Sequence, residues 1–109
     1  MRTLLLSLVV GGTLLAVPPA TFTGIITDTE CTQGGHARMR MGETDAECAR
    51  ACAVYHGSAY VLEEGKNVYT LSDQKLAERF AAQKVAVIGT LDATGKIIQV
   101  ESIAAVKER

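Results

Sequence analysis

Three cysteines and two histidines are the residues of this 109-residue chain whose types and spacing point to chemistry. Cys48 and Cys52 are four residues apart, so on a helix their side chains share one face about one turn apart. His56 continues the same stripe four residues later. Cys31 and His36 lie upstream, in a glycine-containing stretch that can fold back onto this face.

These residue types are metal ligands. Three thiolates and one imidazole form a tetrahedral donor set suited to zinc. Two methionines nearby offer soft thioethers, which together with thiolates favour copper(I) instead. The sequence therefore predicts a zinc or copper site. Its expected ligands are Cys31, His36, Cys48 and Cys52, with His56, Met39 and Met41 as substitutes.

A disulfide is the alternative use of the same cysteines. Cys31 paired with Cys48 or Cys52 would close a loop of about 17–21 residues and stabilise the fold by roughly 3 kcal/mol. A bridge between Cys48 and Cys52 within one helix has less favourable geometry. An odd number of cysteines leaves one thiol over, which would be reactive, paired between chains or a ligand. Both interpretations stay open at this point.

The first twenty residues have the pattern of a secretory signal peptide. Arg2 precedes an apolar run from Thr3 to Val17, and Pro18-Pro19-Ala20 ends it. The run of about 15 residues is shorter than the roughly 20 needed to span a bilayer. We therefore expect a periplasmic or extracellular protein with no membrane insertion after cleavage, in a compartment where disulfides persist.

The composition argues against a nucleic-acid partner. Without residues 1–20 the chain loses one of its 11 basic residues and none of its 12 acidic ones, so the remainder is slightly acidic. Phosphate binding needs clustered positive charge, and base stacking needs aromatic side chains, which make up 5% of the chain with no Trp. A metal ion, another protein or a second copy of the chain remain as partners, the last through a spare cysteine or a strand edge.

Catalysis is the weakest of the functional interpretations. Cys48 lies in the first turn of the expected helix, where the helix dipole lowers a thiol pKa, so a thiol-dependent enzyme is a third alternative. The carboxylates of Asp28, Glu30 and the Glu63-Glu64 pair are expected to be solvated rather than to act as an acid and base. No catalytic residue is predicted, and we expect a secreted, non-catalytic binding domain, or alternatively a disulfide-stapled structural or interaction domain.

The sequence predicts five strands and two helices, one helix between the first two strands and the other between the third and the fourth. Thr44 and Glu47 form a capping-box pattern that opens a helix over 45–56, and Gly57 is suited to end it. Ser72 is expected to cap a second helix over 73–82. Runs rich in β-branched residues, separated by glycine-containing turns, predict strands at 21–28, 59–63, 67–71, 84–91 and 96–103.

This order predicts a mainly β, α+β domain with the oligonucleotide/oligosaccharide-binding (OB) fold, a five-stranded barrel with a helix between strands three and four. The Cys-bearing segment, about 29–57, would be an insertion between strands one and two of a single domain spanning 21–109. Gly24 and Gly89 lie inside strand patterns, at places where a small barrel needs bends or bulges.

The chain also resembles a known family. It is similar to small secreted proteins of environmental bacteria, notably acidobacteria, for which no activity is established, and to periplasmic bacterial OB-fold proteins. The resemblance implies a fold and a compartment rather than a chemistry, and Thr32 departs from it where glycine is expected after the first cysteine. It rests on Thr23 to Cys31, His36, Met39, Met41, Asp45-x-x-Cys48-x-x-x-Cys52, Val68 to Asp73, Phe80, Val85 to Leu91 and Ile98 to Ile103.

Overall fold

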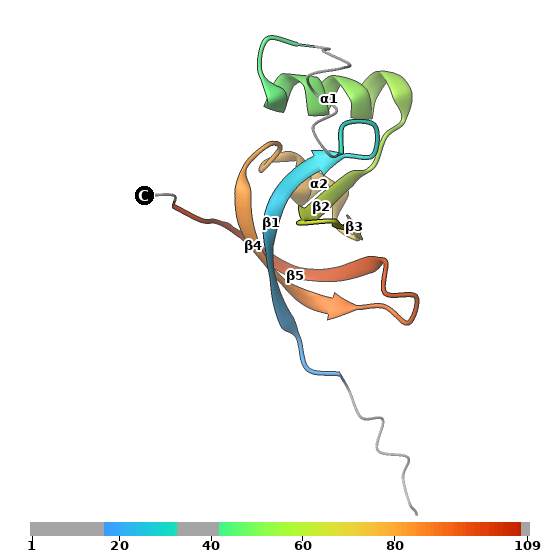
Figure 1. The fold of residues 1–109 in the computed structure, drawn as a ribbon, viewed down its shortest axis with the longest axis vertical. Helices are drawn as coiled ribbons and strands as arrows, with labels where there is room; N and C mark the ends of the chain where they lie inside the picture. The colour runs from blue at the N-terminus through green and yellow to red at the C-terminus, as the bar shows by residue number, and fades with distance from the viewer. Residues whose placement is uncertain (1–16, 33–41, 108–109) are drawn as a thin grey trace, which may run out of the picture.

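Five strands and two helices make up the part of the chain that the structure describes (Figure 1). The structure is a computed structural model, and it describes residues 17–32 and 42–107. Most of the expected signal peptide lies outside these ranges. The elements are β1 (Ala20–Asp28), α1 (Asp45–His56), β2 (Tyr60–Glu64), β3 (Asn67–Leu71), α2 (Gln74–Glu78), β4 (Lys84–Leu91) and β5 (Ile97–Ala105).

Helix α2 is shorter than the sequence pattern predicts, and its expected cap was wrong. The Ser72 hydroxyl is not a cap because it accepts a hydrogen bond from the backbone N–H of Val100 on β5, at 2.9 Å. Asp73 caps the helix instead, by accepting from the N–H of Leu76 at 3.0 Å. Beyond Glu78 the backbone continues in hydrogen bonds spaced three residues apart, which are tighter than those of an α-helix.

The segment after α2 ends at Ala82, whose backbone is left-handed with φ of 64°. Its N–H donates to the carbonyl of Ile26 at 2.7 Å, and this bond holds the turn against β1. A residue with a Cβ is strained in this conformation and glycine is not. Ala82→Gly should therefore raise the free energy of unfolding by up to about 1 kcal/mol, measured by urea denaturation.

The neighbouring Ala81 supplies the control for this prediction. Ala81 is buried and has no positive φ, so Ala81→Gly should destabilise the protein by loss of packing and by added chain entropy. A less stable Ala82→Gly variant would contradict the strain assigned to this turn.

The five strands close into a ring in the order β1-β2-β3-β5-β4. The ring closes because β1 pairs twice: its first part, 20–25, lies antiparallel to β4, and its last part, 25–28, lies antiparallel to β2. The only parallel contact among the described strands joins β3 to β5. The expected mainly β architecture with two short helices is confirmed.

Two glycines allow the strands of the ring to approach closely. Gly24 lies where β1 changes partner, and a Cβ there would collide with the backbone carbonyl of Glu63. Gly89 lies at a shift in the register between β4 and β5, and a Cβ there would collide with the carbonyl of Gln99. Both positions therefore require glycine, in agreement with the bends expected from the sequence.

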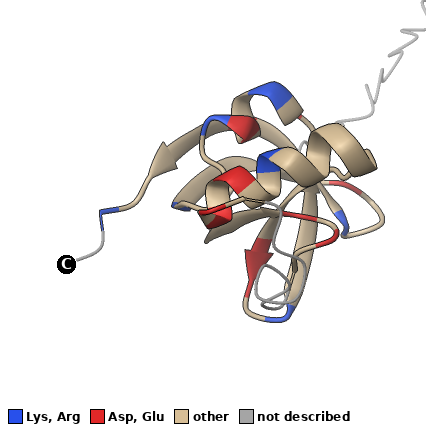
Figure 2. Cartoon of the chain, turned by 90° about the horizontal axis from the view of Figure 1, so that it is seen from above, with Lys and Arg blue, Asp and Glu red and all other residues tan. Residues whose placement is uncertain are grey.

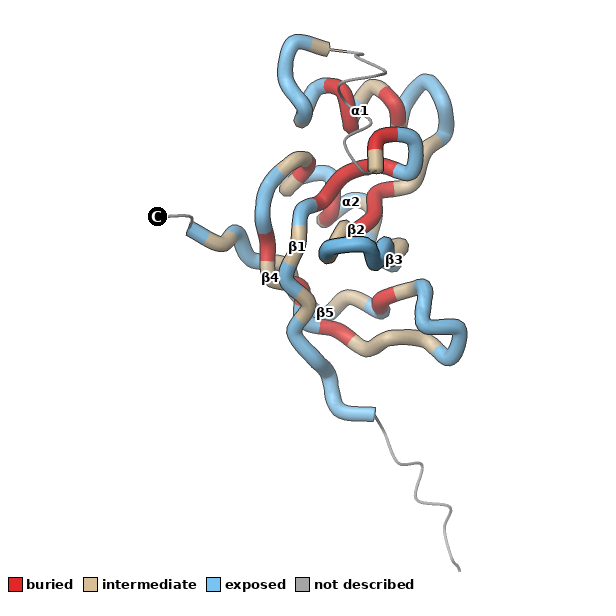
Figure 3. The backbone as a smooth tube through the Cα atoms, viewed as in Figure 1, coloured by how far each residue is buried: buried red, intermediate tan, exposed pale blue. Residues whose placement is uncertain are grey.

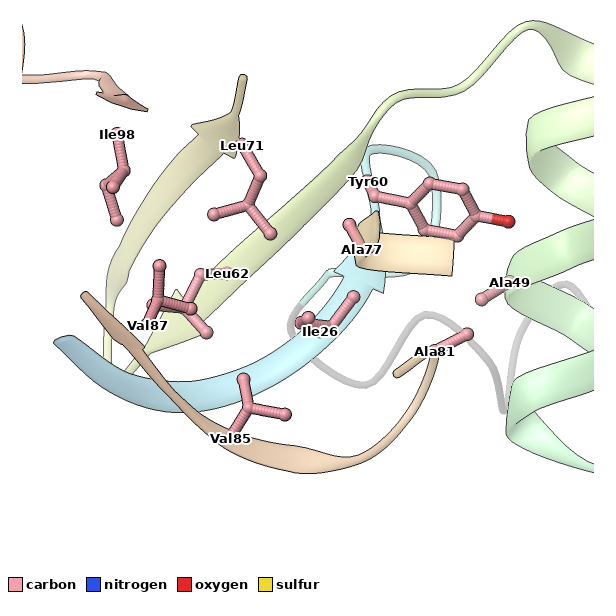
Figure 4. Close-up of a cluster of buried hydrophobic side chains, with 10 residues drawn as sticks. All are labelled: Ile26, Ala49, Tyr60, Leu62, Leu71, Ala77, Ala81, Val85, Val87 and Ile98. Carbon is pink, nitrogen blue, oxygen red and sulfur yellow. The ribbon is translucent and has the colours of Figure 1, made fainter. Parts of the chain in front are cut away.

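The interior of the ring holds the main hydrophobic core (Figures 3 and 4). Alternate residues of each strand point inward, as the period of two in a strand requires. Helix α1 contributes Ala49 to the edge of this core, and Ala77 and Ala81 come from α2 and the turn after it. The ring itself supplies Ile26, Tyr60, Leu62, Leu71, Val85, Val87 and Ile98.

Acidic and basic residues are interspersed over the coloured part of the chain in Figure 2. Within residues 17–32 and 42–107, neither helix is long and apolar enough to cross a membrane.

Candidate metal centre

The loop after β1 folds around the carboxylate of Asp28. One oxygen, Oδ1, accepts the backbone N–H of Glu30 at 2.9 Å and that of Cys31 at 3.1 Å. The Cys31 N–H also lies 3.1 Å from the Asp28 carbonyl, and the Thr29 N–H donates to the carbonyl of Ala59 at 3.0 Å. An aspartate that binds the N–H two residues later is a strong local turn former. These bonds fix where Cys31 lies.

Helix α1 supplies the other two cysteines. It starts with the expected capping box, in which the Thr44 hydroxyl accepts the N–H of Glu47 and the Glu47 side chain accepts the N–H of Thr44. It ends at His56, and Gly57, whose backbone is left-handed, caps it. Cys48 and Cys52 lie one turn apart on the face turned toward the loop after β1, and both are fully buried. The helix prediction is confirmed at both ends.

The cap of α1 should contribute to the stability of the site. Thr44→Ala removes the side-chain acceptor for the Glu47 N–H and should lower the free energy of unfolding by about 1 kcal/mol. Thr44→Ser keeps the hydroxyl and should stay close to wild type. Urea denaturation of both variants measures the difference, and equal stabilities would show that the hydroxyl contributes nothing.

The three cysteines form a buried cluster at this junction. Cys31 Sγ lies 3.8 Å from Cys48 Sγ and 3.6 Å from Cys52 Sγ. All three sulfurs lie within 4.8 Å of one another. A disulfide requires about 2.05 Å between sulfurs, so no two of these cysteines are joined by a disulfide.

The spacing of the sulfurs is compatible with one shared metal ion. Zinc binds thiolates at about 2.3 Å, and a tetrahedron with that bond length has edges of about 3.8 Å. A planar arrangement of three thiolates at the same bond length would set the sulfurs about 4.0 Å apart. The two distances from Cys31 lie at or below the tetrahedral edge, and all three sulfurs lie within 4.8 Å of one another, so they are close enough to bind one metal ion and leave a position for a further ligand.

Burial raises the pKa of the Cys31 and Cys52 thiols. Asp28 raises the pKa of Cys31 further through a side-chain hydrogen bond and its negative charge, and it raises the pKa of Cys52 through its charge. For Cys52, the hydrogen bond with Cys31 partly offsets this increase. Without a metal both thiols are therefore neutral at pH 7, and a metal ion would have to displace their protons.

Asp28 is the residue of this site that the sequence analysis missed. Its expected solvation was wrong, because its side chain is fully buried. Oδ1 is used by the turn, whereas Oδ2 has no hydrogen-bond partner among the described residues. A buried carboxylate oxygen with no such partner, on the residue whose other oxygen holds the Cys31 backbone, favours a nearby positive charge. The signal in the sequence was its spacing of three residues before Cys31, which suits a turn that folds back.

None of the other predicted ligands is among the described residues of the sulfur cluster. His56 is at the exposed last position of α1 and does not belong to the sulfur cluster. His36, Met39 and Met41 lie in 33–41, outside the described residues. The residue that follows this segment, Gly42, packs against the start of α1: a Cβ there would lie 3.1 Å from the Cys48 nitrogen. Of the described residues that flank this segment, Thr32 follows Cys31 directly and Gly42 lies beside Cys48.

Comparisons with protein-family models, with curated proteins and with solved structures give no match for this chain. The cysteine cluster is therefore the feature of this chain that indicates a function.

Proposed function

We propose that this protein is a non-catalytic metal-binding domain that holds one zinc ion through Cys31, Cys48 and Cys52. The observation that carries the proposal is that three buried, unbridged sulfurs lie within 4.8 Å of one another, two of the pairs near the edge length of a zinc–thiolate tetrahedron. A thiolate-rich set also suits copper(I). We favour zinc because three cysteines and one histidine form a common structural zinc site.

His36 is our candidate for the fourth ligand. It lies five residues after Cys31, in the segment whose flanking residues, Thr32 and Gly42, adjoin the cluster. Its imidazole would complete a Cys3His set, a common structural zinc site. Asp28 would then act as an outer partner, because its Oδ1 holds the backbone of a ligand rather than the metal.

The fold and the compartment belong to the same proposal. The ring order β1-β2-β3-β5-β4, with α2 between β3 and β4, supports an OB-fold barrel in which α1 and its flanking loop are an insertion between β1 and β2. The signal-peptide pattern of residues 1–20 supports export to the periplasm or the extracellular space. A metal site would stabilise such a small domain, whose hydrophobic core is thin.

Titration of the reduced, metal-free protein with Co²⁺ tests this function. Co²⁺ replaces zinc in thiolate sites and reports sulfur ligation by an ultraviolet charge-transfer band and tetrahedral geometry by its visible bands. We expect both signals to saturate at one Co²⁺ per chain and to disappear when Zn²⁺ is added. Absence of the charge-transfer band, with the thiols shown to be reduced, would refute the proposal. Tight binding of Cu(I) with no binding of Zn²⁺ would refute the choice of zinc.

Metal binding should also release protons in a defined number. Because Cys31 and Cys52 have raised pKa values, both carry protons at pH 7 and must lose them when they bind the metal. We expect at least two protons to be released per zinc ion, and affinity to weaken as the pH falls because protons compete for the sulfurs. Calorimetry in buffers of different ionisation enthalpy counts these protons, and a count near zero would exclude both thiols as ligands.

A further inference from the structure

The last part of strand β5 has an open edge. Only Ile97 and Ile98 of β5 pair with its parallel neighbour β3, whereas the pairing with β4 continues to Ala105. The end of β5 projects from the body of the molecule toward the C-terminus (Figures 1 and 2). No described strand pairs with the β3 side of β5 beyond Ile98. A further strand could therefore be added at this edge.

The backbone hydrogen bonds show which groups of β5 point to this edge. The Val106 N–H donates to the Lys84 carbonyl, just before the start of the paired part of β4, at 2.9 Å. Hydrogen-bonded pairs alternate along an antiparallel ladder, so the backbone of Ala104 also bonds to β4. The N–H and C=O groups of Ile103 and Ala105 then point the opposite way, to the open edge.

This edge lacks the devices that protect strand edges elsewhere in the molecule. On β1, the Thr23 N–H donates to the Glu64 carboxylate at 3.2 Å, and this contact covers part of the strand edge beyond β2. On β5, the Ser72 hydroxyl accepts the Val100 N–H in the same way. Beyond the register shift between β4 and β5, residues 102–105 include no charged side chain and no proline. This stretch is therefore suited to strand addition.

We propose that β5 pairs antiparallel with β5 of a second copy of this chain, with Ala104 opposite Ala104. In this register Ile103 of each copy lies opposite Ala105 of the other, so the open backbone groups bond to one another. Glu101 of each copy lies opposite Lys107 of the other, and both side chains are exposed in the single chain. Opposite charges that face each other across a strand pair stabilise it. A pair centred on Ile103 or on Ala105 would lose this charge match.

The second copy is favoured as the partner because the edge carries its own complement. A two-fold axis through Ala104 makes the same surface meet itself, as in most dimers, and produces the contact of Glu101 with Lys107 twice. The sheet of one copy then continues into the sheet of the other. Strand β5 contributes no residue to the cysteine cluster, so this contact and the metal site can be tested separately.

Sedimentation equilibrium of the folded protein in dilute salt, over a wide range of concentration, tests this contact. We expect a reversible dimer that reductant does not dissociate. Glu101→Lys or Lys107→Glu alone places like charges opposite each other twice and should weaken dimerisation about tenfold. The double variant Glu101→Lys/Lys107→Glu restores opposite charges and should dimerise within about twofold of wild type. A double variant as weak as the single ones would overturn the register.

Two further variants separate the strand edge from general effects of charge or folding. Ala105→Pro removes an N–H from the open edge but none of the bonds to β4, and it should weaken dimerisation at least about tenfold. Lys66→Glu, in the exposed turn between β2 and β3, is the control for charge reversal and should dimerise as wild type does. Circular dichroism checks that each variant is folded.

Three results would overturn the proposal. The first is a protein that stays monomeric at every concentration. The second is a dimer that the single charge reversals and Ala105→Pro leave intact, because its contact would then lie elsewhere. The third is a dimer that reductant dissociates, because a disulfide between chains would then hold it together.

Discussion

Replacing Cys31 by serine should weaken zinc binding by at least about 100-fold. Even the loss of an outer-shell partner costs a metal site roughly 10- to 100-fold in affinity, and Cys31 is proposed as a direct ligand. Its sulfur lies within 3.8 Å of both other sulfurs, so a metal ion held by this cluster would bind Cys31. Competition with a chelating dye of known zinc affinity measures the change.

The same substitution separates a metal site from a packing role. In the wild-type protein, zinc at 100 times its dissociation constant should stabilise the fold by about 2.7 kcal/mol. For a domain of this size that corresponds to a rise in Tm of 10 °C or more. Cys31→Ser, Cys48→Ser and Cys52→Ser should all lose this zinc-dependent rise, whereas His56→Ala, on the exposed end of α1, should keep it. A full zinc-dependent rise in Cys31→Ser would contradict the assignment.

Asp28→Ala should have the second largest effect, a loss of about 10- to 100-fold in zinc affinity. The substitution removes the oxygen that accepts the N–H groups of Glu30 and Cys31, so the loop no longer holds Cys31 against α1. Hydrogen bonds to a charged group contribute about 1.5–3 kcal/mol each, so the metal-free fold should also be weakened. Dye competition and urea denaturation measure the two effects separately.

Asp28→Asn distinguishes positioning from charge. The asparagine side chain keeps an oxygen for the two N–H groups and places an NH₂ donor where Oδ2 lies, beside the cysteines. We expect its zinc affinity to stay within about tenfold of wild type and its Co²⁺ spectrum to keep the tetrahedral bands. An asparagine variant as impaired as the alanine variant would mean that the negative charge, and not the turn, is what the site requires.

Most of the fold followed from local sequence signals. Helix α1 was predicted at its observed ends because Thr44, Glu47 and Gly57 are strong local capping residues. Strands β3 and β4 were also predicted with their observed bounds, from β-branched runs between turn residues. The bounds of helix α2 were predicted less well because both depend on contacts that are distant in sequence: before its start Ser72 bonds to Val100, and after its end Ala82 bonds to Ile26.

The site was predicted in its residue types but not in its geometry. A spacing of four places Cys48 and Cys52 on one helix face, and this needed no structure. The distance from Cys31 to these two cysteines depends on the turn at Asp28, and it decides between a disulfide and a shared metal ion. Asp28 is buried where α1 packs over the end of β1. The same spacing of four also suggested His56 as a ligand, but His56 is the last residue of the helix and lies at the surface.

One measurement tests the central claim most directly: the metal content and the thiol content of the same sample, purified without added chelator or reductant. The account predicts one zinc ion per chain by elemental analysis. It also predicts three titratable thiols per chain once the protein is denatured and the metal removed. One titratable thiol and no stoichiometric metal would contradict it, because Cys31 would then be joined to Cys48 or Cys52 by a disulfide.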